Sequence, residues 1–534
     1  FDLVEDGIFV AHNVQFDANL LAENLFFEGY ELRNPRVDTV ELAQVFFPEL
    51  EKYSLPILCR ELGIPLKHAH TALSDAQATA ELLLFLREKM AQLPKGLLER
   101  LLEMADALLY ESYLVIEEIY RNQSILIFPD LVEVQGLYFK KTAALLKPRK
   151  LSQDFSKNIS LLNLEVREEQ ENFAKEVGLL LKDESVSLIQ APTGIGKTYG
   201  YLLPALSQVK ERQIVLSVPT KILQNQIMEE EGKRLKDVFH IDIHSLKGPH
   251  NYLKLDAFYR SLQENDENRL FRRFKMQLLV WLTETETGDL DEIGQLYRYQ
   301  HFLRDLRHDG NLSSKSLFVT EDFWKRSQER AQTCKLLVTN HAYLVTRLED
   351  NPEFVSDRLL IIDEVQKVLL ALENLLQQTY DIQSIVDLID KALLEEQNKV
   401  QQRILESIRF ECLYLIEQFQ SGKSKKNILD SLANLHQYFS ELEVEGFEEL
   451  VRYFTADRDY WLEAIETSQK KIQISSTKSG RILLSSLVPD SCQVLGVSAT
   501  LEISQRVSLA DLLGYPEAKF VKIEARRKQD QEVV

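Results

Sequence analysis

The sequence predicts an α/β protein built from several domains. At 534 residues it is longer than one hydrophobic core usually supports, and ordinary domain sizes suggest roughly three to four units. Residues 187–206, SLIQAPTGIGKTYGYLLPAL, read as a buried strand, a glycine-containing loop and a helix. Residues 359–366, LLIIDEVQ, read as a second buried strand, because parallel strands covered on both faces are apolar throughout. Strands that alternate with helices are typical of α/β folds.

Composition narrows the class of protein. The net charge of -20 argues against a uniformly basic coat for nucleic acid, so phosphate contacts would come from local patches. The four cysteines are scattered without a CxxC pair, which excludes a zinc finger or disulfide framework and favours a reducing, cytoplasmic location. No apolar run is long enough to span a membrane, and no leader opens the chain. Since the first residue is Phe1, we expect a part of a longer protein.

The first ninety residues contain a candidate metal site. Asp17 follows the strand-like segment DGIFVAHN where helical spacing begins, and Asp75 follows His70 by little more than one helical turn. Phosphodiester cleavage by two metal ions needs carboxylate ligands and a base for the attacking water. We predict Asp17 and Asp75 as metal ligands and His70 as the base. The alternative is that both acids are helix N-terminal carboxylates favoured by the dipole and that His70 is a surface cap.

Two further segments of the first 160 residues are assigned to structure. Asp38 precedes Glu41 by three residues before an apolar run, which is the spacing of a capping box, so Asp38 is predicted to cap a helix. Residues 91–160 are predicted as a connector with one long helix, then short strands and a basic tail. We interpret Lys147, Arg149 and Lys150 in that tail as ordinary linker charge.

The loop after residue 190 predicts a nucleotide site. Gly194 and Gly196 let backbone amides turn toward phosphate, Lys197 can reach the β and γ phosphates, and the Thr198 hydroxyl can bind Mg²⁺. Asp363 at the end of the second strand would meet the same ion, and Glu364 would polarise the hydrolytic water. A solvated strand end is the weaker alternative for the two acids.

A possible strand-binding surface is indicated between residues 269 and 308. RLFRRFK and YRYQHFLRDLRH interleave basic and aromatic residues, which could contact phosphates and stack on the bases of a single strand. The alternative is a solvated helix face over a core. The candidate residues are Arg272, Arg273, Tyr297, Arg298 and Tyr299.

These motifs carry resemblances to known families. HNVQFD at residues 12–17 and HTALSD at residues 70–75 resemble the DnaQ-like 3'-to-5' exonucleases of the DEDDh type, which implies four acidic ligands; two are expected on an earlier strand outside this chain. A second set of motifs resembles the superfamily 2 helicases of the XPD and DinG group. These motifs are the glycine-containing loop, DEVQ, IVLSVPTKILQNQ, LLVTNHAYL and VLGVSATL. An exonuclease ahead of such a helicase resembles the DinG family of Gram-positive bacteria.

The resemblance implies a partial RNase H-like exonuclease domain followed by a RecA-like helicase lobe with two helical inserts, the second at the position of an Arch domain. The expected boundaries are exonuclease 1–90, connector 91–160, helicase segments 161–247, 335–370 and 481–534, and inserts 248–334 and 371–480. It also implies strand contact by Thr220. The implied nucleotide-binding residues are Arg167, Gln170, Pro192, Thr193, Gly194, Ile195, Gly196, Lys197 and Thr198.

The sequence departs from the family at three places. Lys254 stands where a cluster cysteine is expected, and Cys334 is the only cysteine between the Ia-like segment and DEVQ, so we predict no iron-sulfur cluster. Gln366 stands where the family usually has histidine. The second RecA-like lobe with its arginine finger is absent from residues 1–534, so this chain is expected to bind nucleotide but to hydrolyse it slowly.

The predicted function is an ATP-regulated 3'-to-5' exonuclease and helicase acting on single-stranded DNA or RNA. The expected cofactors are ATP and Mg²⁺ or Mn²⁺, and no membrane partner is expected. Two alternatives remain open: an ATP-gated nuclease without unwinding, and a non-catalytic nucleic-acid clamp. The choice between DNA and RNA, the cellular pathway, the protein partners and the oligomeric state are left open by the sequence.

Overall fold

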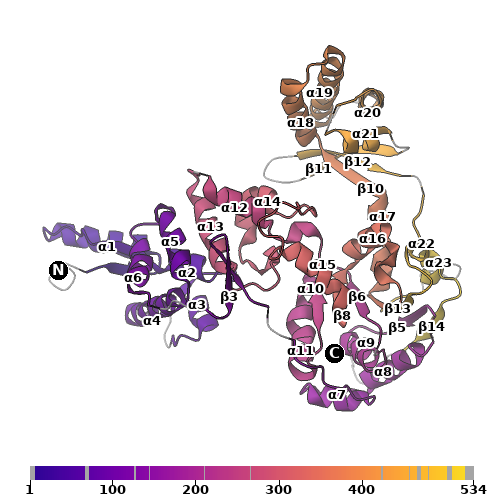
Figure 1. Cartoon of the computed structure of the whole chain (residues 1–534), viewed down its shortest axis with the longest axis horizontal. Coiled ribbons are helices and arrows are strands. Elements are labelled where there is room, and N and C mark those ends of the chain that lie inside the picture. The colour runs from indigo at the N-terminus through magenta and orange to yellow at the C-terminus, as the bar shows by residue number, and fades with distance from the viewer. Residues whose placement is uncertain are drawn as a thin grey trace, which may run out of the picture. The chain divides into compact units, whose positions relative to one another are not determined.

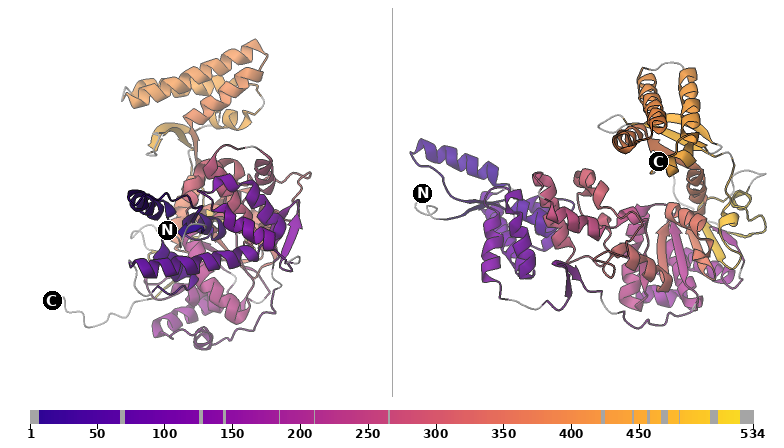
Figure 2. Two further views of the ribbon diagram at one scale, coloured as in Figure 1. Left: turned by 90° about the vertical axis from the view of Figure 1, so that its left-hand side faces the viewer. Right: turned by 45° about the horizontal axis from the view of Figure 1, so that its top comes forward.

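The computed structural model describes most of the chain, in two compact units. One unit joins residues 1–146 to residues 246–333, and the other joins residues 147–245 to residues 334–534. Figure 1 and Figure 2 show the elements of both. In the described part, no helix is both long and apolar enough to cross a bilayer. The described residues are 7–66, 71–124, 128–142, 145–183, 185–209, 211–264, 266–421, 425–444, 446–455, 458–465, 471–478, 480–501 and 508–523.

The first unit begins with two short parallel strands that each lead into a helix. Strand β1 (Phe9–Ala11) pairs in register with β2 (Arg36–Asp38), with Ala11 opposite Asp38. Helix α1 (Val14–Phe27) follows β1, and α2 (Thr39–Phe46) follows β2. The later elements are α3 (Leu55–Leu62), α4 (Ala72–Ala91), α5 (Lys95–Glu103), α6 (Tyr113–Asn122) and the hairpin β3 (Leu131–Val134) and β4 (Leu137–Lys140).

The predicted single long helix in the connector is wrong, because residues 104–112 separate α5 from α6. In this break, the Ser112 hydroxyl donates to the Leu109 carbonyl and accepts from the Asp38 amide. A side chain that ties the end of β2 to this turn favours two helices over one. The connector therefore packs as part of the first unit, and its sequence periodicity alone did not reveal the break.

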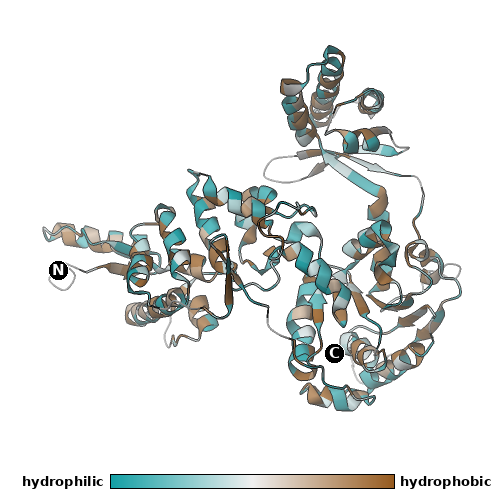
Figure 3. Cartoon of the chain, in the orientation of Figure 1, coloured by the Kyte–Doolittle hydropathy of each residue, from teal (hydrophilic) through white to brown (hydrophobic). Residues whose placement is uncertain are grey.

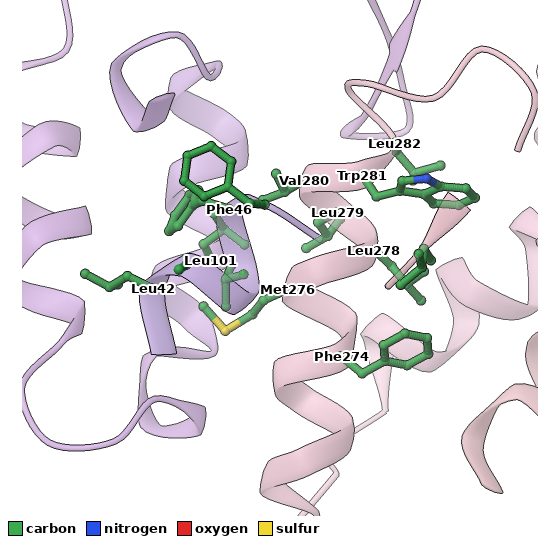
Figure 4. Close-up of a cluster of buried hydrophobic side chains, with 14 of the residues drawn as sticks. Leu42, Phe46, Leu101, Phe274, Met276, Leu278, Leu279, Val280, Trp281 and Leu282 are labelled. Atoms are coloured by element: carbon green, nitrogen blue, oxygen red, sulfur yellow. The ribbon is translucent and has the colours of Figure 1, made fainter. Parts of the chain in front are cut away.

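Residues 246–333 contribute four helices to the same unit: α12 (Leu255–Gln263), α13 (Arg269–Trp281), α14 (Gln300–Leu306) and α15 (Phe323–Thr333). Every residue from Phe274 to Leu282 is buried, which is typical of a helix covered on all sides. Figure 4 shows Leu42, Phe46 and Leu101 facing α13, where Met276 and Val280 project toward them. Residues far apart in sequence therefore share one hydrophobic core. This grouping by contacts differs from the sequence-based boundary at residue 90.

The second unit is organised around a parallel sheet of seven strands in the order β14-β5-β13-β9-β6-β8-β7. Its central strands are buried along almost their whole length, which confirms the α/β class. The strands are β5 (Ser187–Gln190), β6 (Ile214–Val218), β7 (Ile243–Ser245), β8 (Leu336–Asn340), β9 (Leu359–Asp363), β13 (Gln493–Ser498) and β14 (Lys519–Lys522). Its helices include α7 (Phe155–Leu161), α8 (Glu168–Leu180), α9 (Lys197–Gln208), α10 (Lys221–Ile227), α11 (Lys233–Phe239), α16 (His341–Asp350), α17 (Val368–Leu376), α22 (Leu484–Leu487) and α23 (Leu509–Leu513).

The insert between β9 and β13 is not purely helical, which corrects the prediction from its sequence. It contains an antiparallel sheet in the order β10-β12-β11, with β10 (Gln377–Asp381), β11 (Asp459–Ile465) and β12 (Lys471–Thr477). Its helices are α18 (Ile382–Glu395), α19 (Lys399–Gln420), α20 (Lys425–Ser440) and α21 (Glu448–Thr455), and Figure 3 shows both hydrophilic and hydrophobic residues on the first three. The polar run QQTYD has no strand-like periodicity, and its pairing with β12 spans about ninety residues of chain, so local sequence did not predict it.

Candidate nucleotide and nuclease sites

The phosphate-binding loop runs from β5 to α9 with two glycines in the left-handed region. Gly194 has φ of 81° and Gly196 has φ of 82°, a conformation that residues with a side chain adopt at a cost. The Gly196 carbonyl accepts a hydrogen bond from Gln170 Nε2 at 2.8 Å. A Cβ atom at Gly196 would lie 2.2 Å from that nitrogen, whereas one at Gly194 would meet no atom within 4 Å. Gln170, on α8, therefore holds the end of the loop.

Lys197 and the acids of β9 meet at the carboxyl edge of the sheet. Lys197 Nζ lies 2.8 Å from Glu364 Oε1, in an ion pair that is largely shielded from solvent. The Tyr201 hydroxyl donates to Asp363 Oδ2 at 3.2 Å, and a hydrogen bond also joins the side chains of Tyr201 and Thr198. Burial raises the pKa of Asp363, and Lys197 opposes this effect. The two predicted Mg²⁺ ligands, Thr198 and Asp363, thus share Tyr201 as a neighbour.

Glu364 occupies an unusual backbone position and is connected to β13. Its φ is 48°, in the left-handed region that non-glycine residues rarely adopt. Gln366 Nε2 donates to Glu364 Oε2 at 2.6 Å, and the Ser498 hydroxyl lies 2.6 Å from Gln366 Oε1. Burial alone would raise the pKa of Glu364, but the hydrogen bonds from Lys197 and Gln366 outweigh it and lower that pKa. Gln366 therefore links the acid to the SAT segment by hydrogen bonds, in the place where the family has histidine.

The donor set at this site fits a magnesium ion. A carboxylate and a hydroxyl are the oxygen ligands that Mg²⁺ takes beside the phosphates of a nucleotide, and here they come from Asp363 and Thr198. Of the remaining predicted nucleotide-binding residues, Ile195 is buried, Pro192 is half-buried, and Thr193 and Arg167 are exposed. Arg167 is the residue that precedes α8.

The structure describes two of the three predicted nuclease residues. Asp17 is exposed in the first turn of α1, and Asp75 is half-buried in the first turn of α4. His70 lies outside the described residues. Within the described ranges, no three His, Cys, Asp or Glu side chains come together as a metal site. The first-turn positions also agree with the alternative that both acids stabilise helix ends.

Residues 1–83 match the family model of an exonuclease, and residues 169–276 match that of the DEAD/DEAH box helicases. The chain joins an exonuclease region to a helicase region. It is 31% identical over 428 residues to the 3'-5' exonuclease DinG of Staphylococcus epidermidis, which covers 76% of this chain and 47% of that protein. The 3'-5' exonuclease DinG of Staphylococcus aureus is 29% identical over 379 residues. That match covers 69% of this chain and 42% of the Staphylococcus aureus protein. The chain thus spans about half the length of the curated relatives it matches.

Two solved structures are also similar to the chain. The match to an XPD helicase covers 67% of this chain and 62% of that helicase chain, with a TM-score of 0.36 and 15% sequence identity. A truncated XPD covers 66% of this chain and 99% of its own with a TM-score of 0.35 and 13% identity.

Asp38 has a larger structural role in the exonuclease region than its sequence position indicated. Its buried carboxylate accepts from the amides of Asn13 and Val14 at the start of α1, both at 3.1 Å, and from Val40 in α2 at 2.9 Å. One side chain therefore caps two helices. The expected capping box is wrong, however, because the Glu41 side chain pairs with Arg273 and accepts from the Leu109 amide.

Some of the residues predicted to contact a nucleic-acid strand are accessible, whereas others are held by neighbouring side chains. Tyr299 is 1% exposed and stacks on Phe274 in the core, so it offers no face to a base. Arg273 pairs with Glu41 and Arg272 with Asp106, both within the first unit. Tyr299 is therefore corrected as a stacking residue because its ring is buried, whereas strand contact by Arg272 and Arg273, which pair with acids, stays a prediction.

Three of the predicted contact residues remain accessible. Tyr297 is 71% exposed, Arg298 is exposed beside Gln295, and Thr220 is exposed where its hydroxyl caps α10. Sequence inspection could not separate Tyr297 from Tyr299 because both lie in one aromatic and basic run.

Lys254, which stands where a cysteine ligand of an iron-sulfur cluster was expected, forms an ion pair. Lys254 Nζ lies 2.6 Å from Asp309 Oδ2. Nearby, buried Lys247 pairs with Asp289 at 2.5 Å and with Asp291 at 2.9 Å. Cys334 is buried, and its carbonyl accepts from Gln213 Nε2 at 2.6 Å. Ionic pairs thus occupy this segment, and the absence of an iron-sulfur cluster stays a prediction.

Sequence inspection missed three residues of these regions. Tyr201 is fully buried and its hydroxyl donates to Asp363, a role that the sequence pattern did not indicate. His12 bridges Thr39 and the Tyr53 carbonyl at 3.0 and 2.9 Å, and burial lowers its pKa. His341, in TNHAYL, lies 2.7 Å from Ser217. His12 lies in HNVQFD and His341 in LLVTNHAYL, so the motifs themselves were the signal for the last two.

Proposed function

We propose that the protein is a 3'-to-5' exonuclease that acts on single-stranded nucleic acid and is regulated by ATP binding to its helicase region. The matched regions and the DinG relatives support a nuclease and a helicase-type ATPase in one chain. The single observation that supports regulation by ATP is which residues make up the first unit. Residues 246–333 leave the helicase sheet after β7, return to it before β8, and pack with the exonuclease region.

The contacts inside the first unit explain why these residues would move as one body. The Glu41–Arg273 pair is largely buried, and Gln277 Nε2 donates to the Gln44 carbonyl at 2.8 Å. The Gly294 amide donates to the Pro48 carbonyl at 2.9 Å. A buried ion pair restrains its two elements strongly, because separating the partners leaves an uncompensated charge. A displacement of β7 or β8 would therefore reach the exonuclease region through these helices.

ATP binding at the nucleotide site would start the conformational change. The Gly194 and Gly196 loop would cradle the phosphates, and Lys197 would exchange its Glu364 partner for the β and γ phosphates. Glu364, once released, would orient the attacking water. Thr198 and Asp363 would hold Mg²⁺, which supplies charge neutralisation at the phosphates when bound. Gln366 and Ser498 would carry the change at Glu364 to β13.

The nuclease chemistry is assigned to Asp17 and Asp75 as metal ligands and to His70 as base. Thr220, Tyr297 and Arg298 are proposed as strand contacts, since they are exposed. The engaged state of Arg272, Arg273 and Tyr299 favours the second candidate, an ATP-gated nuclease that does not unwind duplexes. In that case the insert would serve as a mechanical connection to the exonuclease region.

The deciding experiment follows digestion of a 5'-labelled single strand with Mg²⁺ or Mn²⁺, with and without ATP. We expect a ladder that shortens from the 3' end, disappears in Asp17→Asn and persists in the matched control Glu23→Gln on the same helix. In Lys197→Ala, digestion should persist while its dependence on ATP disappears. Digestion that Asp17→Asn leaves intact would exclude the assigned nuclease site.

Strand displacement separates the two candidate functions. An Asp17→Asn protein that unwinds a tailed duplex with ATP would favour a helicase, whereas a protein that shows ATP-dependent digestion but no displacement would favour the gated nuclease. DNA and RNA strands of the same sequence, tested in parallel, distinguish the substrates.

A further inference from the structure

His341 lies at a junction of three strands behind the nucleotide site. It is the first residue of α16, directly after β8, and its side chain is 2% exposed. Its Nδ1 atom lies 2.7 Å from the hydroxyl of Ser217 on β6. Because β6 lies between β8 and β9 in the sheet, the ring extends from β8 across β6 toward the end of β9. Asp363 and Glu364 are located at that end.

The imidazole is buried beside the backbone of Asp363 and Glu364, and its Nε2 atom makes no hydrogen bond of good geometry among the described residues. Burial lowers the pKa of His341 to about 4, and the backbone groups of Asp363 and Glu364 oppose this by raising it. A neutral imidazole has one donor and one acceptor. Among the described residues, Nε2 is buried with no hydrogen-bond partner. A buried polar atom without a partner destabilises the fold, so its retention beside a reactive site calls for an explanation.

Glu364 is the group beside His341 that needs support. Its left-handed backbone, with φ of 48°, is strained for a residue with a side chain. Its carbonyl accepts one hydrogen bond, from the Lys367 amide at 2.8 Å. A carbonyl oxygen has two lone pairs, so a second donor can be accommodated. In this backbone conformation the Glu364 carboxylate lies 2.8 Å from Lys197 Nζ.

We propose that His341 is a positioning residue for ATP hydrolysis, in which Ser217 fixes Nδ1 and Nε2 holds the backbone at Asp363 and Glu364. This inference rests on the proposed ATPase function and deepens it. Ser217 donates its hydroxyl proton to Nδ1, which leaves the proton on Nε2 for a backbone carbonyl. The Glu364 carboxylate is thereby kept in position after Lys197 has moved to the phosphates.

The chemistry of the side chains permits a test that separates the two nitrogens. A glutamine amide can replace Nε2 of histidine, and an asparagine amide can replace Nδ1, while alanine replaces neither. The proteins to compare are wild type, His341→Gln, His341→Asn and His341→Ala. The measurements are ATP hydrolysis under single-turnover conditions and the affinity for a fluorescent ATP analogue with Mg²⁺.

We expect His341→Ala and His341→Asn to hydrolyse ATP about tenfold more slowly and His341→Gln to stay within about threefold of wild type. Nucleotide affinity should stay within about threefold in all four proteins, because Lys197 and the loop are unchanged. A packing role for the ring predicts instead that rate, affinity and thermal stability fall together in all three variants. That result would overturn the proposal.

The other outcomes are equally decisive. If His341→Asn retains the rate and His341→Gln loses it, the Ser217 contact alone matters and the proposed role of Nε2 is excluded. If wild type and His341→Ala hydrolyse ATP equally, the inference fails while the proposed ATPase stands. If wild type binds the analogue but hydrolyses no ATP, the proposed ATPase fails and takes the inference with it.

Discussion

The nucleotide site and the nuclease residues of this chain differ in how completely they are built. At the nucleotide site, Lys197, Glu364, Gln366 and Ser498 form a chain of contacts from α9 to β13. In the exonuclease region, Asp17 and Asp75 occupy the first turns of two helices, and the described residues there form no cluster of three metal-binding side chains.

The two sets of residues lie on different kinds of element. Seven parallel strands bring the loop after β5 and the ends of β9 and β13 to one edge, so three distant motifs meet by topology. Among the described residues of the exonuclease region, β1 and β2 form a sheet of two strands, and Asp17 and Asp75 lie on helices α1 and α4 rather than at strand ends.

The strongest test of this comparison removes Lys197. Lys197→Ala should lower nucleotide affinity about a hundredfold, because removing one partner of a shielded charge contact costs about 2–5 kcal/mol in binding. Titration with a fluorescent ATP analogue measures the loss, and exposed Lys175→Ala on α8 serves as the control. Digestion without ATP should be unchanged. If Lys197→Ala abolished that digestion too, the two sites would not be separable as described.

A second test concerns the ion pair that joins the insert to the exonuclease region. Arg273→Met should destabilise the first unit by about 3 kcal/mol, because it leaves the nearly buried Glu41 without its partner. Denaturant unfolding measures the change, and the double variant Glu41→Gln with Arg273→Met should recover most of it. Arg60→Met, in an exposed pair with Glu61, should cost about 0.5 kcal/mol or less. Equal losses in the two single variants would contradict a special role for the buried pair.

A third test uses the two glycines of the phosphate loop. Gly194→Ala should cost about 1 kcal/mol, since its φ is positive but a Cβ atom has space. Gly196→Ala should cost more and weaken nucleotide binding further, because the new Cβ would displace the Gln170 amide. Unfolding and analogue binding of both variants provide the comparison. Identical effects at the two positions would show that Gln170 does not hold the loop.

The smallest expected effect is a pH dependence in the exonuclease region. Burial lowers the pKa of His12 below its ordinary value of 6.5, so the unfolded chain takes up a proton first as the pH falls. The stability contributed by neutral His12 is complete above that pH and decreases as the pH falls toward the folded pKa. Wild type should therefore lose more unfolding free energy than His12→Gln between about pH 7.5 and about pH 5.5. A parallel loss in both proteins would contradict this.

Sequence patterns predicted the strand, loop and helix of residues 187–206 because these motifs are local. The loop, DEVQ and SATL each combine a strand with the residues that follow it, and parallel strands place those residues at one edge. Asp38 was correctly assigned to a helix cap for the same reason. Glu41 was assigned wrongly because its partner, Arg273, lies more than two hundred residues away.

The sequence by itself determined the α/β class, the strand-loop-helix of the nucleotide site and the order of the two regions, since these depend on short-range periodicity and turn chemistry. Only the tertiary structure decided that residues 246–333 pack with the exonuclease region, that Tyr299 is buried while Tyr297 is exposed, and that His341 lies behind Glu364. Each of these depends on contacts between segments distant in sequence, and burial of apolar surface across such contacts leaves no local pattern that distinguishes a core residue from a binding residue.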